Sequence, residues 1–511
     1  GNMQQITWGE AVTDAAAKIK AAGSDIAAIA GSQMSNEDLW VLRELLARSG
    51  SKRLGTWIPT HTGADLVAEV GVGYGTNLGS LGKGDAVLII ASDLEEEVPM
   101  WRLRLKQAHD RGAMVVVANA RPTRMDDFAS QVVRYPSGHA AHFMHNLKSE
   151  NADLAKQLTE ATNLIILTGA EGLTLAGSRA LMQAAANFLI DSRHMGRANN
   201  GLISTFPGPN WMGQHYLGYS PETTLDITQK PPKVLIIAQA EILMDDPAAA
   251  KWLSQVETII ALKLFVDDGA NKYAHLLLPI QSFAERDGTF TSGERRVQRF
   301  YTAQGPMGEA LPAWQVLARL NEKLDYSKPK VSAAAVMLDI TKTIPAFAGC
   351  SYKEISKVER QFPDVGGRDL YYGGTAYQNK GGLGVQIKTA ADNGQSVASD
   401  DVQLSDAPKA GSGQMLVVPT TRLYNRESIF QPSTLVHPRV LMPYAEINSA
   451  DAAKLGISSG DVVEISIADI TRVRVKAHVN GGAPEGSVVL PRHLTATAVP
   501  LTITLGEVSK V

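Results

Sequence analysis

A group of charged side chains in the segment 275–300 could bind an anion. An apolar run that stops at Pro279 predicts the end of a buried strand, and a turn signal follows at Asp287-Gly288, where glycine tolerates a positive φ. In α/β proteins, anionic ligands often bind where a strand ends in a glycine turn near arginines. A solvated loop that only joins sheet to helix is the alternative. The charged residues are Glu294, Arg295, Arg296 and Arg299.

Cysteine and histidine usage gives little support for metal or nucleophile chemistry. Cys350 is the single cysteine, so the chain can form no internal disulfide and no iron–sulfur cluster or zinc site with four thiolates of its own. A lone cysteine is more often a small buried residue than a nucleophile. His139, His142 and His145 could share a helix edge, but they lack a nearby carboxylate, which favours a surface location.

The glycines between residues 71 and 84 do not form a recognisable nucleotide loop. A phosphate-binding loop needs Gly-Lys-Ser/Thr, whereas here Lys83 is followed by Gly84. The glycines also precede the strand predicted at 85–91, while a dinucleotide turn follows its strand. The interpretation we favour is a flexible connector.

Length and charge exclude some functions. A chain of 511 residues suggests about three domains. The 49 basic and 52 acidic residues nearly cancel, which disfavours nucleic-acid binding. The apolar runs fall short of the ~18 residues that a membrane helix needs. The polar start lacks the apolar core of a signal peptide, so we expect a cytoplasmic location.

Strand–loop–helix units recur along the first 330 residues and predict doubly wound, mostly parallel sheets. Apolar runs without alternation imply strands that are covered on both faces. The predicted helices span 8–22, 37–49, 99–111, 177–189 and 247–255. The predicted strands span 25–30, 85–91, 113–118, 163–168, 233–238 and 258–262.

The remaining segments differ from these units in residue composition and periodicity. Residues 196–221 have little periodicity and predict an ordered functional or structural loop. Residues 361–383 combine glycine pairs with tyrosines, which favours a strap pinned to a neighbouring domain over a ligand-stacking loop. From residue 413 the pattern becomes β-type, with Arg472 to Val479 alternating polar and apolar as in a half-exposed strand.

The segment 275–300 resembles a motif of the molybdopterin-oxidoreductase superfamily, LP…E-x-DGTF-x-N-x-E-x-R-x-Q. The matching residues are Leu278, Pro279, Glu285, Asp287, Gly288, Thr289, Phe290, Glu294, Arg296 and Gln298. Residues 8–11 are similar to the W-x-E-A that follows the iron–sulfur domain in this family. Residues 448–463 resemble the signature N-x-x-D-A-x-x-L-G-I-x-x-G-D-x-V of its C-terminal barrel.

The resemblance implies a domain arrangement. Residues 1–55 and 220–330 would form one discontinuous α/β domain, and residues 56–219 a second α/β domain inserted in it. Residues 331–412 would be a helical and loop connector, and 413–511 a six-stranded β-barrel of double-psi type. The modules that carry iron–sulfur clusters in the family would lie upstream.

The resemblance also implies positions for the cofactor site. Thr60 aligns with the residue that ligates molybdenum in active members, and His61 with the adjacent histidine of formate dehydrogenases. Threonine is a poor ligand for a soft metal, because its hydroxyl is not readily deprotonated and its β-branch limits approach. Residues 95–97 are three glutamates, which would oppose dinucleotide phosphates or simply begin a solvated helix. The other pocket loops would contain Ser32, Asn36, Asp93, Gly201, Gly288 and Arg296.

Two branches of the family follow from these departures. The segment 361–383 resembles the molybdopterin-oxidoreductase-like subunit of bacterial respiratory complex I (NADH:quinone oxidoreductase). This favours a catalytically silent scaffold with no cofactor or metal in this chain, bound to other peripheral-arm subunits and membrane-associated only through them. The alternative is an active α subunit of the formate dehydrogenase type that binds molybdopterin guanine dinucleotide and uses His61 with Arg295 or Arg296.

Overall fold

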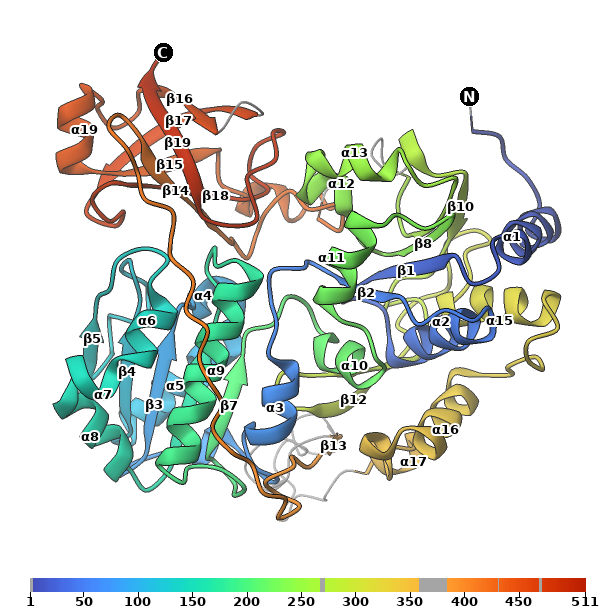
Figure 1. Cartoon of the computed structure of the whole chain (residues 1–511), viewed down its shortest axis with the longest axis horizontal. Helices are drawn as coiled ribbons and strands as arrows, with labels where there is room; N and C mark the ends of the chain where they lie inside the picture. The colour runs from blue at the N-terminus through green and yellow to red at the C-terminus, as the bar shows by residue number, and fades with distance from the viewer. Residues whose placement is uncertain (1–2, 267–271, 358–383, 431, 468–470) are drawn as a thin grey trace. The chain divides into compact units, whose positions relative to one another are not determined.

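The computed structural model describes residues 3–266, 272–357, 384–430, 432–467 and 471–511 (Figure 1). The chain forms two compact units. Unit 1 contains residues 1–59 and 206–388, and unit 2 contains residues 60–205 and 389–511. The predicted strap at 361–383 lies outside the described residues.

Unit 1 is built on a five-stranded parallel sheet in the order β10-β9-β8-β1-β2. Ala28 in its middle pairs with Leu54 on one side and with Ile236 on the other. The strands are apolar along most of their length and almost wholly buried, as the unbroken apolar runs predict. Their bounds are β1 (Ile26–Gly31), β2 (Leu54–Trp57), β8 (Val234–Ala238), β9 (Thr258–Lys263) and β10 (Leu276–Pro279).

The helices of unit 1 begin and end where local chemistry dictates. Thr7 caps α1 through a capping box with Glu10, and the helix stops before Gly23, whose φ is +58°. The predicted helix at 8–22 is confirmed. The helices are α1 (Trp8–Ala22), α2 (Asn36–Arg48), α10 (Trp211–Tyr216), α11 (Pro221–Gln229), α12 (Ile242–Asp245), α13 (Ala250–Leu253), α15 (Ala313–Lys323), α16 (Ala333–Thr343) and α17 (Tyr352–Ile355), with 3₁₀ turns η2 (Pro247–Ala249) and η3 (Pro345–Phe347).

Unit 1 also contains a small antiparallel sheet of β11 (Gly288–Thr291), β12 (Arg296–Phe300) and β13 (Val385–Gln386). The sequence predicted a loop after Asp287, and that prediction is wrong. Gly288 pairs with Phe300, and the rings of Phe290 and Phe300 stack with centroids 4.6 Å apart. These cross-strand contacts stabilise a hairpin, whose pattern is too short to stand out in the sequence.

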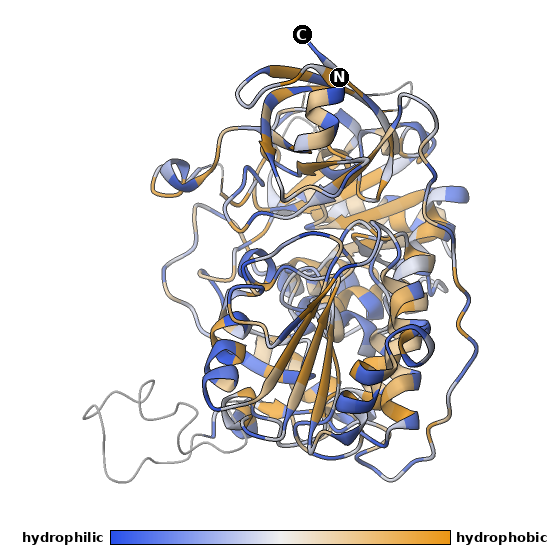
Figure 2. Cartoon of the chain, turned by 90° about the vertical axis from the view of Figure 1, so that its left-hand side faces the viewer, coloured by the Kyte–Doolittle hydropathy of each residue, from blue (hydrophilic) through white to orange (hydrophobic). Residues whose placement is uncertain are grey.

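Unit 2 contains a second five-stranded parallel sheet, in the order β5-β4-β3-β6-β7. Most of this sheet is hydrophobic, as the strands seen face on in Figure 2 show. The strands are β3 (Ala86–Ile90), β4 (Met114–Ala118), β5 (Gln131–Val133), β6 (Leu164–Thr168) and β7 (Gly201–Ser204). The helices are α3 (Ala64–Val70), α4 (Leu94–Glu97), α5 (Pro99–Asp110), α6 (Ala140–His145), α7 (Leu147–Glu150), α8 (Ala152–Glu160) and α9 (Leu175–Asp191).

Two loop predictions in this sequence range need correction. The glycine-rich segment is hydrogen-bonded rather than a free connector: Val72 N–H donates to the Leu202 carbonyl, and Gly73 N–H to that of Asn200. A Cβ on Gly73 would lie 2.2 Å from the Arg197 carbonyl oxygen, so close backbone approach explains the glycine. The segment 196–221 contains strand β7 and helix α10 instead of a continuous loop.

The C-terminal part of unit 2 is a closed six-stranded barrel in the order β14-β18-β15-β17-β16-β19, which confirms the predicted fold class. Helix α19 (Ser449–Leu455) ends at Gly456, whose φ of +64° suits glycine. In β17 the valines point inward and the charged residues outward, as their alternation predicts. The strands are β14 (Met415–Thr420), β15 (Tyr444–Asn448), β16 (Val462–Ile467), β17 (Thr471–Asn480), β18 (Ser487–Pro491) and β19 (Thr504–Lys510).

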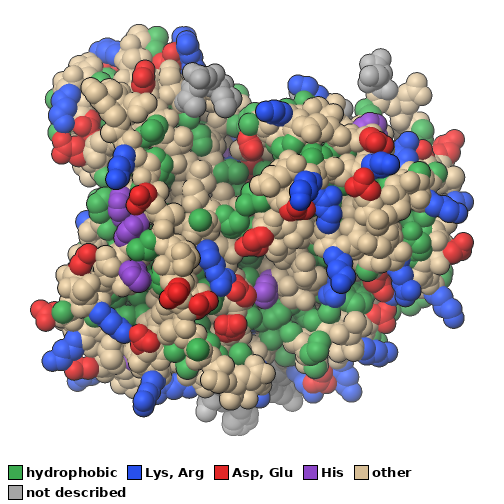
Figure 3. All heavy atoms as spheres, viewed as in Figure 1, with side chains coloured by type: hydrophobic (Ala, Val, Ile, Leu, Met, Phe, Trp, Pro, Cys, Tyr) green, Lys and Arg blue, Asp and Glu red, His purple; other side chains and the backbone are tan. Residues whose placement is uncertain are grey.

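Charged side chains of both signs lie on the surface. On the face shown in Figure 3, basic and acidic side chains are interspersed rather than gathered by sign, in keeping with the net charge of −3. Among the described residues, no helix is both long enough and apolar enough to span a membrane.

Candidate cofactor site

Ligands of parallel α/β sheets bind at the carboxyl ends of the strands, and polar clusters lie there in both units. We name each cluster after the helix that carries its glutamate. The α2 cluster of unit 1 contains Asn36, Glu37, Asp38, Asn210, Arg286, Thr289 and Thr291. The α4 cluster of unit 2 contains Ser92, Asp93, Glu97, Asn119, Arg121, Glu171 and Thr205.

The α2 cluster begins at the cap of its helix. The Ser35 hydroxyl accepts a hydrogen bond from Asp38 N–H at 3.2 Å, and Asp38 Oδ2 accepts one from Ser35 N–H at 2.8 Å. The same carboxylate pairs with Arg286 at 2.8 Å and accepts from Trp314 N–H. Both side chains of the pair are almost completely buried, so the pair joins α2 to the segment before β11 and to α15.

Glu37 is enclosed in the same cluster. Its carboxylate accepts hydrogen bonds from the backbone and hydroxyl of Thr289, both at 2.9 Å, and from the Tyr352 hydroxyl at 3.0 Å. Burial raises the pKa of Glu37 to about 7, against the lowering effect of these hydrogen bonds. A carboxylate with this many internal donors stabilises the contact between α2 and the hairpin.

Amide and hydroxyl side chains complete the α2 cluster. Asn36 donates to the hydroxyls of Thr289 at 3.0 Å and Thr291 at 3.1 Å. Asn210 accepts from Thr291 N–H at 2.7 Å and donates to the Met34 carbonyl. These residues are fully buried, so the α2 cluster is a structural core of polar groups that satisfy one another.

The arginines predicted to bind an anion each have partners inside unit 1. Arg295 is fully buried and donates from Nε to the Ile387 carbonyl at 3.1 Å. Arg296 lies 3.9 Å from the Glu294 carboxylate. Arg299 pairs with Asp287 at 2.6 Å, and its guanidinium contacts two tyrosine rings. An anion site at this cluster stays a prediction.

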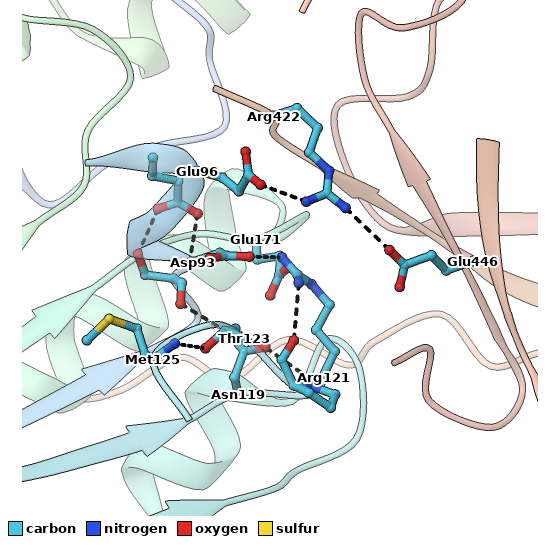
Figure 4. Close-up of polar contacts among 12 residues, drawn as sticks. Asp93, Glu96, Asn119, Arg121, Thr123, Met125, Glu171, Arg422 and Glu446 are labelled. Atoms are coloured by element: carbon cyan, nitrogen blue, oxygen red, sulfur yellow. Dashed lines mark hydrogen bonds and ion pairs between the residues drawn. The ribbon is translucent and has the colours of Figure 1, made fainter. Parts of the chain in front are cut away.

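In the α4 cluster, Arg121 forms the centre of a buried network (Figure 4). Its guanidinium pairs with Asp93 at 3.0 Å and with Glu171 at 2.5 Å, and the three side chains are 12%, 7% and 9% exposed. Burial lowers the pKa of Arg121, but the two carboxylates raise it by more, so the guanidinium stays charged. The network brings together the loops that follow β3, β4 and β6.

Glu97 lies at the end of α4 and closes the other side of this cluster. Its carboxylate accepts from the Ser92 hydroxyl at 2.7 Å, from the Thr205 hydroxyl at 2.7 Å and from Asp93 N–H at 3.2 Å. Burial raises the pKa of Glu97 to about 7. The sequence predicted either repulsion of a phosphate or a solvated helix start here. The hydrogen bonds rule out a simply solvated helix start at Glu97, and repulsion of a phosphate stays a prediction.

The barrel contributes an arginine next to the cluster. Arg422 pairs with Glu96 of α4 at 2.7 Å and with Glu446 of β15 at 3.3 Å (Figure 4). It also donates to the Tyr444 hydroxyl. Leu423 N–H donates to Glu96 as well, at 2.8 Å. The segment after β14 is thus attached to α4 within unit 2.

The proposed metal-ligand position has a hydroxyl. Thr60 Oγ1 lies 3.2 Å from His61 Nδ1. Burial and the charge of Arg492 lower the pKa of His61 to about 4, so the imidazole is neutral at pH 7. Among the described residues, no group of three or more His, Cys, Asp or Glu side chains could hold a metal ion.

The remaining predicted residues are divided between the units. Ser32, Asn36, Gly288 and Arg296 lie in unit 1, whereas Thr60, His61, Asp93 and Gly201 lie in unit 2. A Cβ on Gly201 would lie 2.4 Å from the Gly71 carbonyl oxygen, and one on Gly288 would lie 2.4 Å from the Phe300 ring. Close packing explains both glycines. The single cysteine, Cys350, is buried, which raises the pKa of its thiol to about 12.

One atom of the α4 cluster lacks a partner. Asp93 Oδ1 is buried and has no hydrogen-bond partner among the described residues, although Oδ2 pairs with Arg121. A buried acceptor without a donor is costly unless a ligand supplies one. The N–H edge of a purine base is such a donor, so a nucleotide base would satisfy this oxygen. The hydroxyls of Ser92 and Thr205 already donate to Glu97.

Sequence comparison identifies the family. The profile of the molybdopterin oxidoreductase family matches residues 1–323, and that of the molydopterin dinucleotide binding domain matches residues 423–508. The chain belongs to the molybdopterin oxidoreductase family. The second match covers most of the barrel, including Glu446, the partner of Arg422 in Figure 4.

The relatives with described functions have low sequence identity to this chain, but the matches extend over most of its length. The α subunit of F420-dependent formate dehydrogenase from Methanocaldococcus jannaschii is 23% identical over 96% of this chain and 84% of its own length. The NADPH-Fe(3+) oxidoreductase α subunit of Geobacter sulfurreducens is 24% identical over 96% of this chain and 64% of its own. Acetylene hydratase from Pelobacter acetylenicus shares the fold, with a TM-score of 0.70 at 14% identity over 99% of this chain and 90% of that one.

The expectation that this chain binds no cofactor is wrong. The match to the dinucleotide-binding domain and the formate dehydrogenase relatives both point to a molybdopterin cofactor. That expectation rested mainly on Thr60, whose poor suitability as a ligand bears on the metal and not on the dinucleotide.

Several residues of the α4 cluster were missed in the sequence. Asn119 and Arg121 come directly after the predicted strand at 113–118, and Glu171 after the one at 163–168. The sequence signal that could have identified these residues is their position just past the carboxyl ends of neighbouring parallel strands, where ligands bind. Arg422 had no such signal, because only the barrel brings it to Glu96.

Proposed function

We propose that the chain binds a molybdopterin dinucleotide and serves as the α subunit of a formate dehydrogenase type of oxidoreductase. The observation that carries the proposal is the buried Oδ1 of Asp93 at the carboxyl edge of the sheet in unit 2, which has no hydrogen-bond partner within the part of the chain that the structure describes. The dinucleotide-binding match and the formate dehydrogenase relatives support the same assignment.

The residues of unit 2 would hold the cofactor by its nucleotide end. Asp93 would accept from the base, and Arg121 would keep that carboxylate oriented. Ser92 and Thr205 supply hydroxyl donors of the kind that bind phosphate. When bound, the metal–pterin group supplies two-electron redox chemistry, and the chain supplies binding and orientation.

The test is to purify the chain from cells that make the cofactor and to measure bound pterin, molybdenum and formate-dependent dye reduction. We expect stoichiometric pterin dinucleotide and activity with formate. Asp93→Asn would leave the fold intact, since the amide keeps the size of the side chain, but would lower pterin content several-fold. A chain free of pterin under these conditions would contradict the proposal.

A second candidate is a structural role in a complex I type of NADH:quinone oxidoreductase, without turnover at a metal. The observation that favours it is the hydroxyl of Thr60 at the metal-ligand position, since soft metals prefer thiolates. Bound pterin without formate-dependent activity would favour this candidate. Under it, Thr60→Cys would not by itself create activity, whereas the first proposal predicts that activity rises in this variant.

A further inference from the structure

Helix α4 is too short to fix its own position. It has only four residues, and a single helical turn forms too few hydrogen bonds to be stable alone. Its place in unit 2 therefore depends on its side chains, and each of its three glutamates contacts a different element. The contacts are Glu95 with Arg102 of α5 at 2.6 Å, Glu96 with Arg422 after β14 at 2.7 Å, and Glu97 with Thr205 after β7 at 2.7 Å.

Glu96 is linked directly to Asp93, the residue that precedes α4. The Asp93 carbonyl accepts hydrogen bonds from Glu96 N–H at 3.0 Å and from Glu97 N–H at 2.9 Å. The side chain of Asp93 has the buried Oδ1 that lacks a partner among the described residues. A movement of Glu96 therefore moves the turn that holds this oxygen.

Arg422 connects Glu96 to the barrel. Its guanidinium also pairs with Glu446 of β15 at 3.3 Å, and the neighbouring Leu423 N–H donates to Glu96 at 2.8 Å (Figure 4). The side chains of Arg422, Glu96 and Glu446 are 20%, 20% and 15% exposed, so water screens this network less than it screens an ion pair on the surface. Because a guanidinium has several N–H donors in a fixed plane, it can bridge two carboxylates.

The contact with α4 is one of several that hold this part of the barrel. Arg426 N–H donates to the His493 carbonyl at 2.8 Å, which keeps the far end of the segment 421–427 on the barrel. Ile503 N–H donates to the Gly172 carbonyl at 2.7 Å, which joins the barrel to the sheet of unit 2 without Arg422. Loss of Arg422 would therefore free the segment 421–427 from α4 without separating the barrel from the sheet.

We propose that Arg422 is a positioning residue for the cofactor site, whose ion pair with Glu96 holds the segment 421–427 against α4 and slows the release of a nucleotide bound at Asp93. Arg422 acts through Glu96 and need not touch the nucleotide. The inference rests on the proposed function, because it requires a nucleotide at Asp93.

The test is the rate at which pterin leaves the purified chain after dilution into cofactor-free buffer, measured by gel filtration at intervals and fluorescence of the oxidised pterin. In Arg422→Met we expect release to be roughly three- to tenfold faster, because changes in contacts act mostly on dissociation. The pterin content before dilution should stay near that of the wild type, since Asp93 and Arg121 are intact. A merely structural role for Arg422 would not change release in this selective way.

The matched control is Arg474→Met, the same substitution in the same barrel. Arg474 pairs with Glu464 at 2.7 Å, but its side chain is 65% exposed and lies on the outer face of β17. Release from this variant should match the wild type. Hydrogen–deuterium exchange of the segment 421–427 should be faster in Arg422→Met than in Arg474→Met, which measures the contact itself.

A double variant tests whether Arg422 acts through Glu96. Glu96→Gln should also speed release, and Glu96→Gln combined with Arg422→Met should release pterin no faster than Arg422→Met alone, because both remove one contact. Release that is unchanged in a pterin-containing Arg422→Met variant, or that is additive in the double variant, would overturn this inference alone. Absence of pterin from the wild type would overturn the proposed function and the inference with it, so the two failures are distinguishable.

Discussion

The α2 and α4 clusters occupy equivalent positions in their own sheets, at the carboxyl ends of parallel strands, yet they differ in one respect. Each contains a glutamate whose pKa burial raises to about 7. In the α2 cluster the glutamate and its neighbours are fully buried, and helix, hairpin and loop side chains satisfy one another. In the α4 cluster the glutamate is partly exposed, and Asp93 keeps a buried oxygen without a partner among the described residues.

The difference shows how one architecture serves two purposes. The sheet edge collects polar groups because loops leave there and strand-end backbone groups need partners. Where the chain supplies every partner, the result is a structural contact that holds helix and hairpin together. Where one partner is left out, as at Asp93, we propose that a ligand supplies it. Burial and hydrogen-bond satisfaction, rather than residue type, separate the two.

Breaking the buried ion pair of the α2 cluster should have the largest effect. Asp38→Ala leaves Arg286 charged and buried, and removes the acceptor for Ser35 N–H. We expect the free energy of unfolding to fall by about 3–5 kcal/mol, as a shift in the urea midpoint of unit 1. A loss below about 1 kcal/mol would mean that the α2 cluster is not the structural core described here.

The pH dependence of the α2 cluster provides the next test. Because the folded pKa of Glu37 is raised from 4.5 to about 7, the stability linked to its proton is complete below about pH 4.5 and is lost as the pH rises to about 7. Relative to Glu37→Gln, the wild type should therefore become less stable by about 2–3 kcal/mol between these values. Urea titrations of both proteins at several pH values would measure it, and a difference that is constant with pH would contradict the account.

The same disruption in the α4 cluster should cost less stability and more binding. Arg121→Met leaves Asp93 and Glu171 without their shared cation, but these side chains are slightly more exposed than those of the Asp38–Arg286 pair. We expect a loss of about 2 kcal/mol in the free energy of unfolding together with a several-fold loss of bound pterin. If Arg121→Met is more damaging to stability than Asp38→Ala, with pterin content unchanged, the contrast between the clusters is wrong.

The smallest effect is expected at the rim of the α4 cluster. Glu95 pairs with Arg102 at 2.6 Å, but the two side chains are 40% and 21% exposed. Solvent screening limits such a pair, so Glu95→Ala should change the free energy of unfolding by less than about 0.5 kcal/mol. A larger change, measured by the same urea titration, would show that the whole of α4, and not only Glu97, contributes to the cluster.

The fold could be predicted where the signal was local. Unbroken apolar runs located β1, β3, β4, β6, β8, β9 and β10, and α1 and α2 were also predicted, because these patterns depend on residues that are close in sequence. The short strands β2, β5 and β7 were not predicted. The hairpin β11–β12 was predicted as a loop. Its Thr289 and Thr291 are buried against Asn36, about 250 positions away in the chain, and that partner is invisible in a local pattern.

The site could be predicted only in part for a related reason. Asp93 was identified from a family motif, but Arg121, Glu171 and Thr205 join it only through the strand order β4-β3-β6-β7. Glu97 was interpreted from its charge alone, because its three donors come from two strand ends that only the fold brings together. The expectation that the chain binds no cofactor, which is wrong, followed from Thr60, a residue that bears on the metal and not on the nucleotide.

The most direct test of the account is the pterin content of the purified chain, measured as a fluorescent oxidised pterin alongside molybdenum by mass spectrometry. We predict stoichiometric pterin dinucleotide in the wild type and a several-fold reduction in both Asp93→Asn and Arg121→Met. A wild-type chain that folds fully in cofactor-producing cells and yields no pterin would contradict the central claim that the α4 cluster holds a nucleotide.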